Sequence, residues 1–242
     1  MSVIEEQVSC ASRSVGDLVA ERPLRARVFE SVGIDFCCGG KVPLAALCQA
    51  RGLNLDRVLA ELRAAVTPAA EQTNWAEASL TALVGHIQAR YHEPLRVELP
   101  RISAMLAKVV SRHGDHLPGT LLPLQQTYET LQEELLDHMT KEDRILFPAI
   151  VALENGDPLP MPDASAWISQ PIGVMEAEHA AAGAALARIR EVTDGFVPPD
   201  WACPTFRGLY HALAQLETDM HVHVFLENHV LFPRSAQLAT GQ

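Results

Sequence analysis

Two segments of the sequence carry the same arrangement of potential metal-binding side chains. Residues 138–148 and 223–233 each begin with a histidine, have a glutamate four residues later and end in Leu-Phe-Pro. The segments are 223 − 138 = 85 residues apart, which indicates the duplication of a helix pair. Residues four apart lie on one helix face about 6 Å apart along the axis, so each imidazole and carboxylate can reach one metal ion or two neighbouring ions.

If the second and fourth helices are duplicates, the first and third should each offer one more histidine. The third helical pattern contains only His179, whereas the first contains both His86 and His92. The offsets to His179 are 93 and 87 residues, and spacing alone does not choose between them. His92 lies beside Pro94, where a helix is expected to kink. The mid-helix position of His86 makes it the favoured candidate.

Four histidines and two glutamates that converge in a bundle predict a dinuclear metal site. Each metal would receive two imidazoles, and the two glutamates have spare oxygens with which to bridge the metals. Imidazole and carboxylate ligands without thiolate are typical of non-haem iron or manganese rather than structural zinc, and carboxylate-bridged sites in bundles commonly hold two irons. A single His-x-x-x-Glu on a helix is usually a surface pair, so the prediction depends on the repeat.

The remaining histidines show no such pattern. His221 and His229 are expected to point away from the ligand face, and surface positions are expected for His113, His116 and His211. Two acids lie next to predicted ligands: Glu134, one turn before His138, and Glu178, before His179. Either they accept hydrogen bonds from ligands or they are solvated surface acids.

The pattern of apolar residues predicts an all-α fold with two domains. Hydrophobic residues make up 48% of the chain but aromatic residues only 5%, which suits packed helices. Four long helical patterns, at about 76–112, 120–153, 171–194 and 200–231, predict an antiparallel four-helix bundle. Pro94 and Pro100 predict kinks in the first helix, Pro171 predicts the start of the third, and the Leu-Phe-Pro tails predict helix ends.

A smaller helical domain is expected before the bundle. Short helical patterns separated by glycines occupy about 14–66, and a polar stretch without periodicity follows. We therefore expect a small domain over 1–66, a linker over 67–75 and the bundle over 76–236. A domain of about 50 residues is small for a self-sufficient core, so it is expected to lean on the bundle.

The charge and the apolar runs exclude several classes of function. The net charge of −11 argues against a general binder of nucleic acid and against binding to an anionic membrane surface. No apolar run approaches the roughly 18 residues of a membrane-spanning helix, and acidic residues stand where a signal peptide would be basic. We therefore expect a cytoplasmic protein, in which five cysteines are thiols rather than a disulfide framework.

These motifs together resemble a known family. The repeated His-x-x-x-Glu segments with Leu-Phe-Pro tails, and Glu178-His179, resemble the hemerythrin-like cation-binding domain. The segment 34–41, Ile-Asp-Phe-Cys-Cys-Gly-Gly-Lys, resembles the small N-terminal domain of the iron–sulfur cluster repair di-iron proteins. The resemblance implies two non-haem irons with an oxo bridge, and similarity to members induced by nitric oxide. The ligands that it implies are His86, His138, Glu142, His179, His223 and Glu227.

Cys37 and Cys38 are the other candidate site. Adjacent cysteines cannot easily ligate one metal together, and a disulfide between them would be strained. Gly39-Gly40 frees the backbone, and Lys41 supplies positive potential that would lower a thiol pKa. The alternative is that both are small buried residues at a turn. The resemblance implies a redox or iron-relay role.

Two functions are consistent with these features. In the first, the chain supplies iron to damaged or apo iron–sulfur proteins after nitrosative or oxidative stress. In the alternative, the di-iron site binds or reduces nitric oxide or dioxygen at an open coordination position. The cysteine domain favours the first, because gas chemistry in the bundle does not need it. Whether the chain is an enzyme stays open, as does its oligomeric state, for which a homodimer is one option.

Overall fold

The computed structural model describes residues 10–22, 25–37, 39–64, 74–158 and 164–241. Every regular element in these ranges is a helix, and the only β feature among them is an isolated bridge between Ser14 and Pro43. The predicted all-α class is therefore confirmed. None of the helices in the described ranges has the length and apolar character that a bilayer crossing requires.

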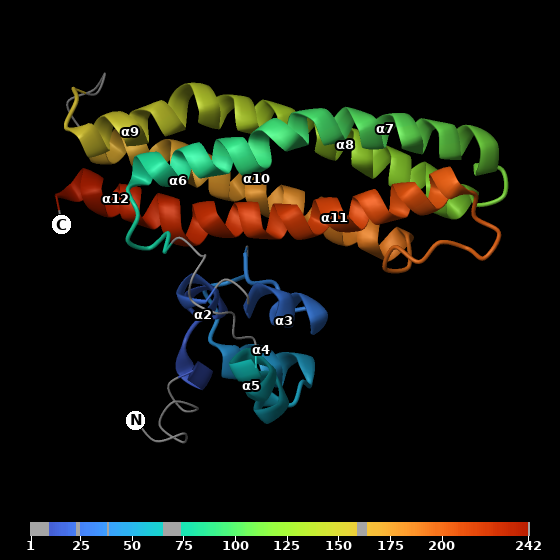
Figure 1. Cartoon of the computed structure of the whole chain (residues 1–242), viewed down its shortest axis with the longest axis horizontal. Coiled ribbons are helices and arrows are strands. Elements are labelled where there is room, and N and C mark those ends of the chain that lie inside the picture. The colour runs from blue at the N-terminus through green and yellow to red at the C-terminus, as the bar shows by residue number, and fades with distance from the viewer. Residues whose placement is uncertain (1–9, 23–24, 38, 65–73, 159–163, 242) are drawn as a thin grey trace.

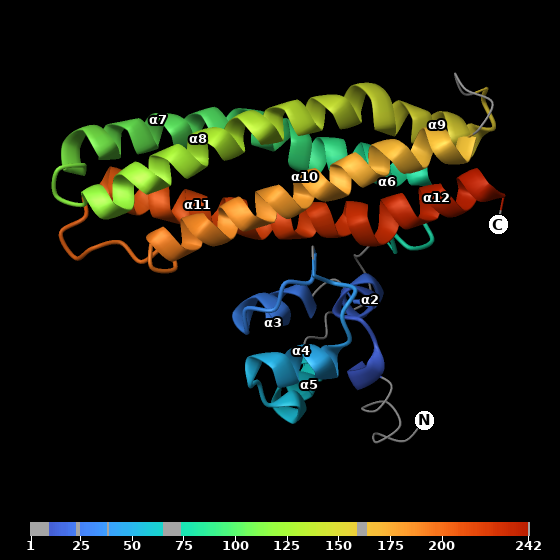
Figure 2. The same ribbon diagram turned by 180° about the vertical axis from the view of Figure 1, so that it is seen from behind.

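Four long helical rods form an antiparallel bundle (Figures 1 and 2). The first three rods are α6 (Leu80–Ile87), η1 (Gln88–His92) and α7 (Glu93–His113), then α8 (Pro118–Lys141), η2 (Glu142–Leu146) and α9 (Phe147–Asn155), then α10 (Ala164–Val192). The fourth rod is α11 (Pro204–Leu226), η3 (Glu227–Leu231) and α12 (Phe232–Thr240). The three segments labelled η are π-helical.

Apolar residues at helical spacing hold the rods together. On α7, Leu95, Leu99, Ile102, Leu106 and Val109 recur every three or four residues and are buried, and α8 buries an equivalent stripe. Tyr128 lies within this core, and its hydroxyl donates to the Leu99 carbonyl at 2.8 Å. The first rod begins where the Ser79 side chain accepts from the Ala82 amide and Glu154 accepts from the Leu80 amide.

Two predicted helix boundaries are wrong. The third helix begins at Ala164 rather than Pro171, and Pro171 lies inside it. The fourth rod does not end at Leu231 but continues as α12 to Thr240. The second rod ends at Asn155, close to the predicted residue 153, so neither Leu-Phe-Pro tail ends its rod. Pro148 and Pro233 each lie two residues after a π-helical segment, where the backbone hydrogen bonds change register. A missing N–H is tolerated at such a position because it resembles the first turn of a new helix.

A small helical module packs beside the bundle (Figure 1). It contains α2 (Val15–Glu21), α3 (Arg25–Ser31), α4 (Leu44–Arg51) and α5 (Leu55–Ala64), around a core that includes Phe29 and Phe36. Helix α2 contacts η3 of the bundle, and the Phe36 ring packs against Phe225. The predicted linker, 67–75, lies mostly outside the described residues.

Candidate metal centre

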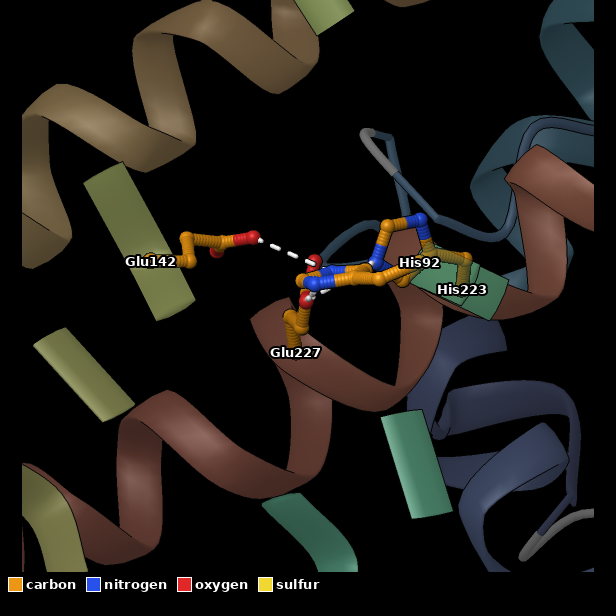
Figure 3. A group of neighbouring side chains, drawn as sticks. All are labelled: His92, Glu142, His223 and Glu227. Atoms are coloured by element: carbon orange, nitrogen blue, oxygen red, sulfur yellow. Dashed lines mark hydrogen bonds and ion pairs between the residues drawn. The ribbon is translucent and has the colours of Figure 1, made fainter. Parts of the chain in front are cut away.

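Two groups of buried side chains in the middle of the bundle could each hold a metal ion. One contains His92, Glu142, His223 and Glu227, shown in Figure 3. The other contains His138 and His179 with the same two glutamates. Within each group the ligand atoms lie within 4.8 Å of one another. Because both glutamates belong to both groups, they are placed to bridge two metals.

The π-helical segments position these side chains. Glu142 is the first residue of η2, Glu227 is the first of η3, and His92 is the last of η1. A π-helical turn widens the helix locally and changes which side chains face the core beyond it, and such segments are frequent at functional sites. All three segments therefore lie where a rod must present a ligand to the interior.

Hydrogen bonds on the outer ring nitrogens aim three of the histidines inward. His92 Nδ1 bonds to Asp143 Oδ1 at 2.9 Å, and His138 Nδ1 bonds to Glu178 Oε2 at 2.9 Å. The third bond joins His179 Nδ1 to Asn228 Oδ1 at 2.8 Å. Each acceptor favours a proton on Nδ1 and leaves the Nε2 lone pair facing the site, as metal-binding histidines require.

The inner nitrogens converge in pairs. The Nε2 atoms of His138 and His179 are 3.0 Å apart, and so are those of His92 and His223. In the first pair both Nδ1 atoms already have acceptors, so two neutral rings would face each other with lone pairs. A cation between the two Nε2 atoms, either a proton or a metal ion, removes that repulsion.

The two buried glutamates also fit a metal. Both are fully buried, and Glu142 Oε1 has no hydrogen-bond partner. The groups nearest the other oxygens are the ligand imidazoles: Glu142 Oε2 lies 3.2 Å from His138 Nε2, and Glu227 Oε2 lies 3.1 Å from His179 Nε2. Carboxylates in a protein interior are costly unless a cation compensates their charge. The residues present therefore fit a dinuclear metal site of imidazoles and bridging carboxylates.

The ionisation of the metal-free site reflects the same need for positive charge. Burial alone would lower the pKa of His92, but hydrogen bonds to Asp143, Glu142 and Glu227 raise it to about 11. Burial likewise opposes protonation of His138, and the Glu142 charge raises its pKa to about 9. Against the effect of its own burial, the interaction with His223 and hydrogen bonds from His179 and His92 hold the pKa of Glu227 well below its usual value. Protons thus supply the charge that a metal would bring.

The structure brings five of the six predicted ligands together, and His86 is not among them. His86 is half-buried and packs on the Trp75 ring, with the ring centroids 4.4 Å apart. His92 takes its place because η1 lies between the two histidines and shifts the face of the helix, so Pro94 does not carry His92 out of the core. Two features of the sequence indicated His92. Pro94 follows it by two residues, as Pro148 and Pro233 follow Leu146 and Leu231 in the repeated segments. Its offset of 87 residues from His179 is also closer to the repeat spacing of 85 than the offset of 93 for His86.

The other predicted residues are also placed. Glu178 is a hydrogen-bond partner of the ligand candidate His138, and Lys141 holds its other oxygen at 2.6 Å. Glu134 lines a surface cavity that reaches His138 and His179. His221 and His229 lie outside both metal groups. His116 and His211 are exposed, whereas His113 is half-buried beside Trp201.

The cysteine loop lies against the bundle. Cys37 is buried, its thiol lies 3.2 Å from Asp35 Oδ1, and its carbonyl oxygen accepts from His229 Nε2 at 3.0 Å. Asp35 also accepts from the Cys37 and Gly39 amides, which closes the loop. Cys38 lies outside the described residues.

Asn228, the hydrogen-bond partner of His179, was not predicted from the sequence. The available signal was its position directly after Glu227, as Asp143 follows Glu142.

Comparison with known proteins identifies the domains and relatives that this chain matches. Residues 83–235 match the hemerythrin HHE cation-binding domain, and residues 11–66 match ScdA_N, a domain of unknown function (DUF542). The chain is 36% identical to the iron–sulfur cluster repair protein YtfE of Pectobacterium atrosepticum, over 92% of this chain and 96% of that protein. It is 37% identical to YtfE of Yersinia pseudotuberculosis, over 93% and 96%. The chain therefore belongs to the family of the iron–sulfur cluster repair proteins YtfE, with a hemerythrin HHE cation-binding domain as its bundle.

Proposed function

We propose that this chain repairs damaged iron–sulfur clusters by supplying iron from a di-iron site in its bundle. The observation that carries the proposal is the pair of buried His/Glu groups that share two carboxylates. The relatives that match nearly the whole chain are named iron–sulfur cluster repair proteins. Repair implies damaged or apo iron–sulfur proteins as partners.

Six residues would hold the two irons: His92, His138, Glu142, His179, His223 and Glu227. The pair of irons would supply exchangeable, redox-active metal, with an oxo bridge as the expected additional ligand. Each iron would receive two imidazoles and share both carboxylates. Four protein ligands per iron leave coordination positions open, and a partly open site suits a metal that must leave.

The cavity beside the second metal group is the proposed route for iron. It is lined by Glu134, Asp137, Lys141 and Glu178 and reaches His138 and His179. Carboxylates suit ferrous iron as transient oxygen ligands. Lys141 bonds both Asp137 and Glu178, so these acids are held in place.

We assign Cys37 and Cys38 a redox or relay role at the contact with the iron acceptor. The support is the resemblance of segment 34–41 and the contact of the Cys37 carbonyl with the bundle. The names of the relatives favour repair over binding of nitric oxide or dioxygen. A nitric oxide ligand, a cytoplasmic location, a homodimer and the boundaries 1–66 and 76–236 stay predictions.

The test is iron transfer to an enzyme whose [4Fe–4S] cluster has lost one iron, with a reductant present. We expect wild type to restore the cluster, Glu227→Ala to fail because it holds less iron, and the Cys37/Cys38 double alanine variant to be slow. Undiminished repair by a well-folded double variant would remove the thiol role. Repair by Glu227→Ala at the wild-type rate would contradict iron supply from this site. Retention of iron against both a chelator and the acceptor would instead favour gas chemistry.

A further inference from the structure

The two halves of the metal centre differ at one equivalent position. Asp143 directly follows Glu142, and Asn228 directly follows Glu227. Each bonds Nδ1 of the histidine on the preceding rod: Asp143 holds His92 and Asn228 holds His179. The anchor is therefore a carboxylate in one half and a neutral amide in the other.

The surroundings of the two anchors also differ. Asp143 is fixed within the bundle by Gln88 at 2.9 Å and Arg96 at 2.8 Å. Asn228 is only 8% exposed, and its Nδ2 lies 3.5 Å from the carbonyl oxygen of Cys37, which belongs to the small module. His229, the next residue, donates to the same carbonyl. Among the described residues, the amide anchor is thus in contact with the small module, whereas the printed partners of the carboxylate anchor, Gln88, His92 and Arg96, all belong to the bundle.

The contact between the Asn228 amide and the Cys37 carbonyl determines which nitrogen of His179 carries the proton. A backbone carbonyl only accepts hydrogen bonds, so the Cys37 carbonyl favours the Asn228 orientation in which Nδ2 faces it. That orientation turns Oδ1 toward His179, and because Oδ1 only accepts, the His179 proton must lie on Nδ1. The lone pair of His179 Nε2 is then aimed at the metal group that contains His138.

We propose that Asn228 is a positioning residue that couples docking of the small module to retention of the metal held by His138 and His179. The proposal rests on the two-iron site proposed above and assigns its regulation. With the Cys37 loop docked, His179 is held in its metal-binding tautomer. Any partner that draws the loop away frees the Asn228 amide to rotate, and that metal is released faster.

Gly16 offers a way to disturb docking without touching the metal groups. A Cβ atom at Gly16 would lie 2.5 Å from His229 Nδ1, too close for the present packing. Gly16→Ala therefore displaces the His229 ring and weakens its bond to the Cys37 carbonyl. A second undocking variant, His229→Ala, removes the donor itself. Faster alkylation of Cys37, mapped by mass spectrometry, reports the undocking.

The experiment follows iron release from the ferrous full-length protein into an excess of a colorimetric ferrous chelator. Removing such an outer hydrogen-bond partner typically costs 10–100-fold in metal affinity, so Asn228→Ala should speed release of half the iron by about tenfold. Gly16→Ala and His229→Ala should speed the same half. Mössbauer spectra of ⁵⁷Fe-loaded Asn228→Ala should show one iron altered and the other unchanged.

The double variant Asn228→Ala/Gly16→Ala should release iron no faster than Asn228→Ala alone, because both act through one contact. Asp143→Asn is the matched control, and its effect should fall on the other iron and add to that of Gly16→Ala. Asn228→Asp keeps an acceptor for His179 but no donor for Cys37, so its release should be near the wild-type rate and insensitive to Gly16→Ala.

Undocked Gly16→Ala and His229→Ala proteins that release iron at the wild-type rate would overturn the coupling, as would effects that multiply in the double variant. Thermal melts of the metal-free variants show whether each is folded. If Asn228→Ala does not fold, the coupling is tested by comparing iron release from Asn228→Asp with and without Gly16→Ala. Cluster repair is not measured here. Two bound irons with unchanged release would therefore contradict this inference and leave the proposed function standing.

Discussion

At the scale of single residues, alanine variants of His86 and His92 test the proposed ligand set. We expect His92→Ala to lose iron, because it removes an imidazole from one metal group, and His86→Ala to retain about two irons per chain. His86 packs on Trp75 and lies outside both metal groups. Iron content by elemental analysis of folded variants measures both. Iron loss in His86→Ala with full retention in His92→Ala would restore the ligand set that the sequence favoured.

A second residue-scale prediction concerns protons. The pKa of His138 is raised to about 9 and that of His92 to about 11, so both are protonated at pH 7 in the metal-free protein. Imidazole must be neutral to bind a metal, so binding should release protons. Calorimetric titration of ferrous iron at pH 7, in buffers of different ionisation enthalpy, measures their number. A binding enthalpy that is independent of the buffer would contradict the protonated site.

The same pKa values set the stability of the metal-free protein. A histidine whose pKa is raised on folding stabilises the fold fully below its unfolded pKa of 6.5, and this contribution is lost as the pH rises through the folded value. The histidines whose pKa is lowered, such as His223 and His229, titrate below pH 6.5, so they do not contribute to the pH dependence of stability above 6.5. The melting temperature of the metal-free protein should therefore fall between pH 6.5 and 9. A flat or rising melting temperature over that range would be inconsistent with protonated His138.

At the scale of elements, the π-helical segments decide which side chains reach the metals. Deleting the exposed Ala89 from η1 would restore a regular α-helix but turn α6 by about 100° relative to His92. We expect the deletion variant to stay helical by circular dichroism yet lose iron or melt at a lower temperature, whereas Ala89→Ser does neither. Normal iron content and melting in the deletion variant would show that η1 is not needed.

The elements also show what the sequence could and could not predict. Helical periodicity predicted the four rods, and the repeat of His138 and Glu142 at His223 and Glu227 predicted the bridging pair. His86 was favoured because Pro94 was expected to kink the helix at His92, whereas the π-helical turn of η1 places His92 on the inward face. Proline was also interpreted as a helix stop in the Leu-Phe-Pro tails, although Pro148 and Pro233 lie in the first turns of α9 and α12. Asn228 was missed because its role depends on the Cys37 carbonyl, 191 residues away.

At the scale of the whole molecule, the bundle should bind metal without the small module. A protein of residues 74–242 keeps all six proposed ligands and both duplicated helix pairs. It should fold and bind about two irons, but release one faster because the Cys37 carbonyl is gone. Iron content and thermal melts of this protein beside the full chain check the prediction. A folded 74–242 protein without iron would mean that the small module is needed to build the site.

The central claim is that iron held by the His/Glu cluster enters the damaged cluster of another protein. The most direct measurement loads this chain with ⁵⁷Fe and mixes it with an enzyme whose cluster has lost one unlabelled iron, beside a reductant. The repaired enzyme is then isolated and its Mössbauer spectrum recorded. The account predicts that ⁵⁷Fe appears in the enzyme's [4Fe–4S] cluster as its activity returns. Recovery of activity without ⁵⁷Fe in the cluster would contradict it.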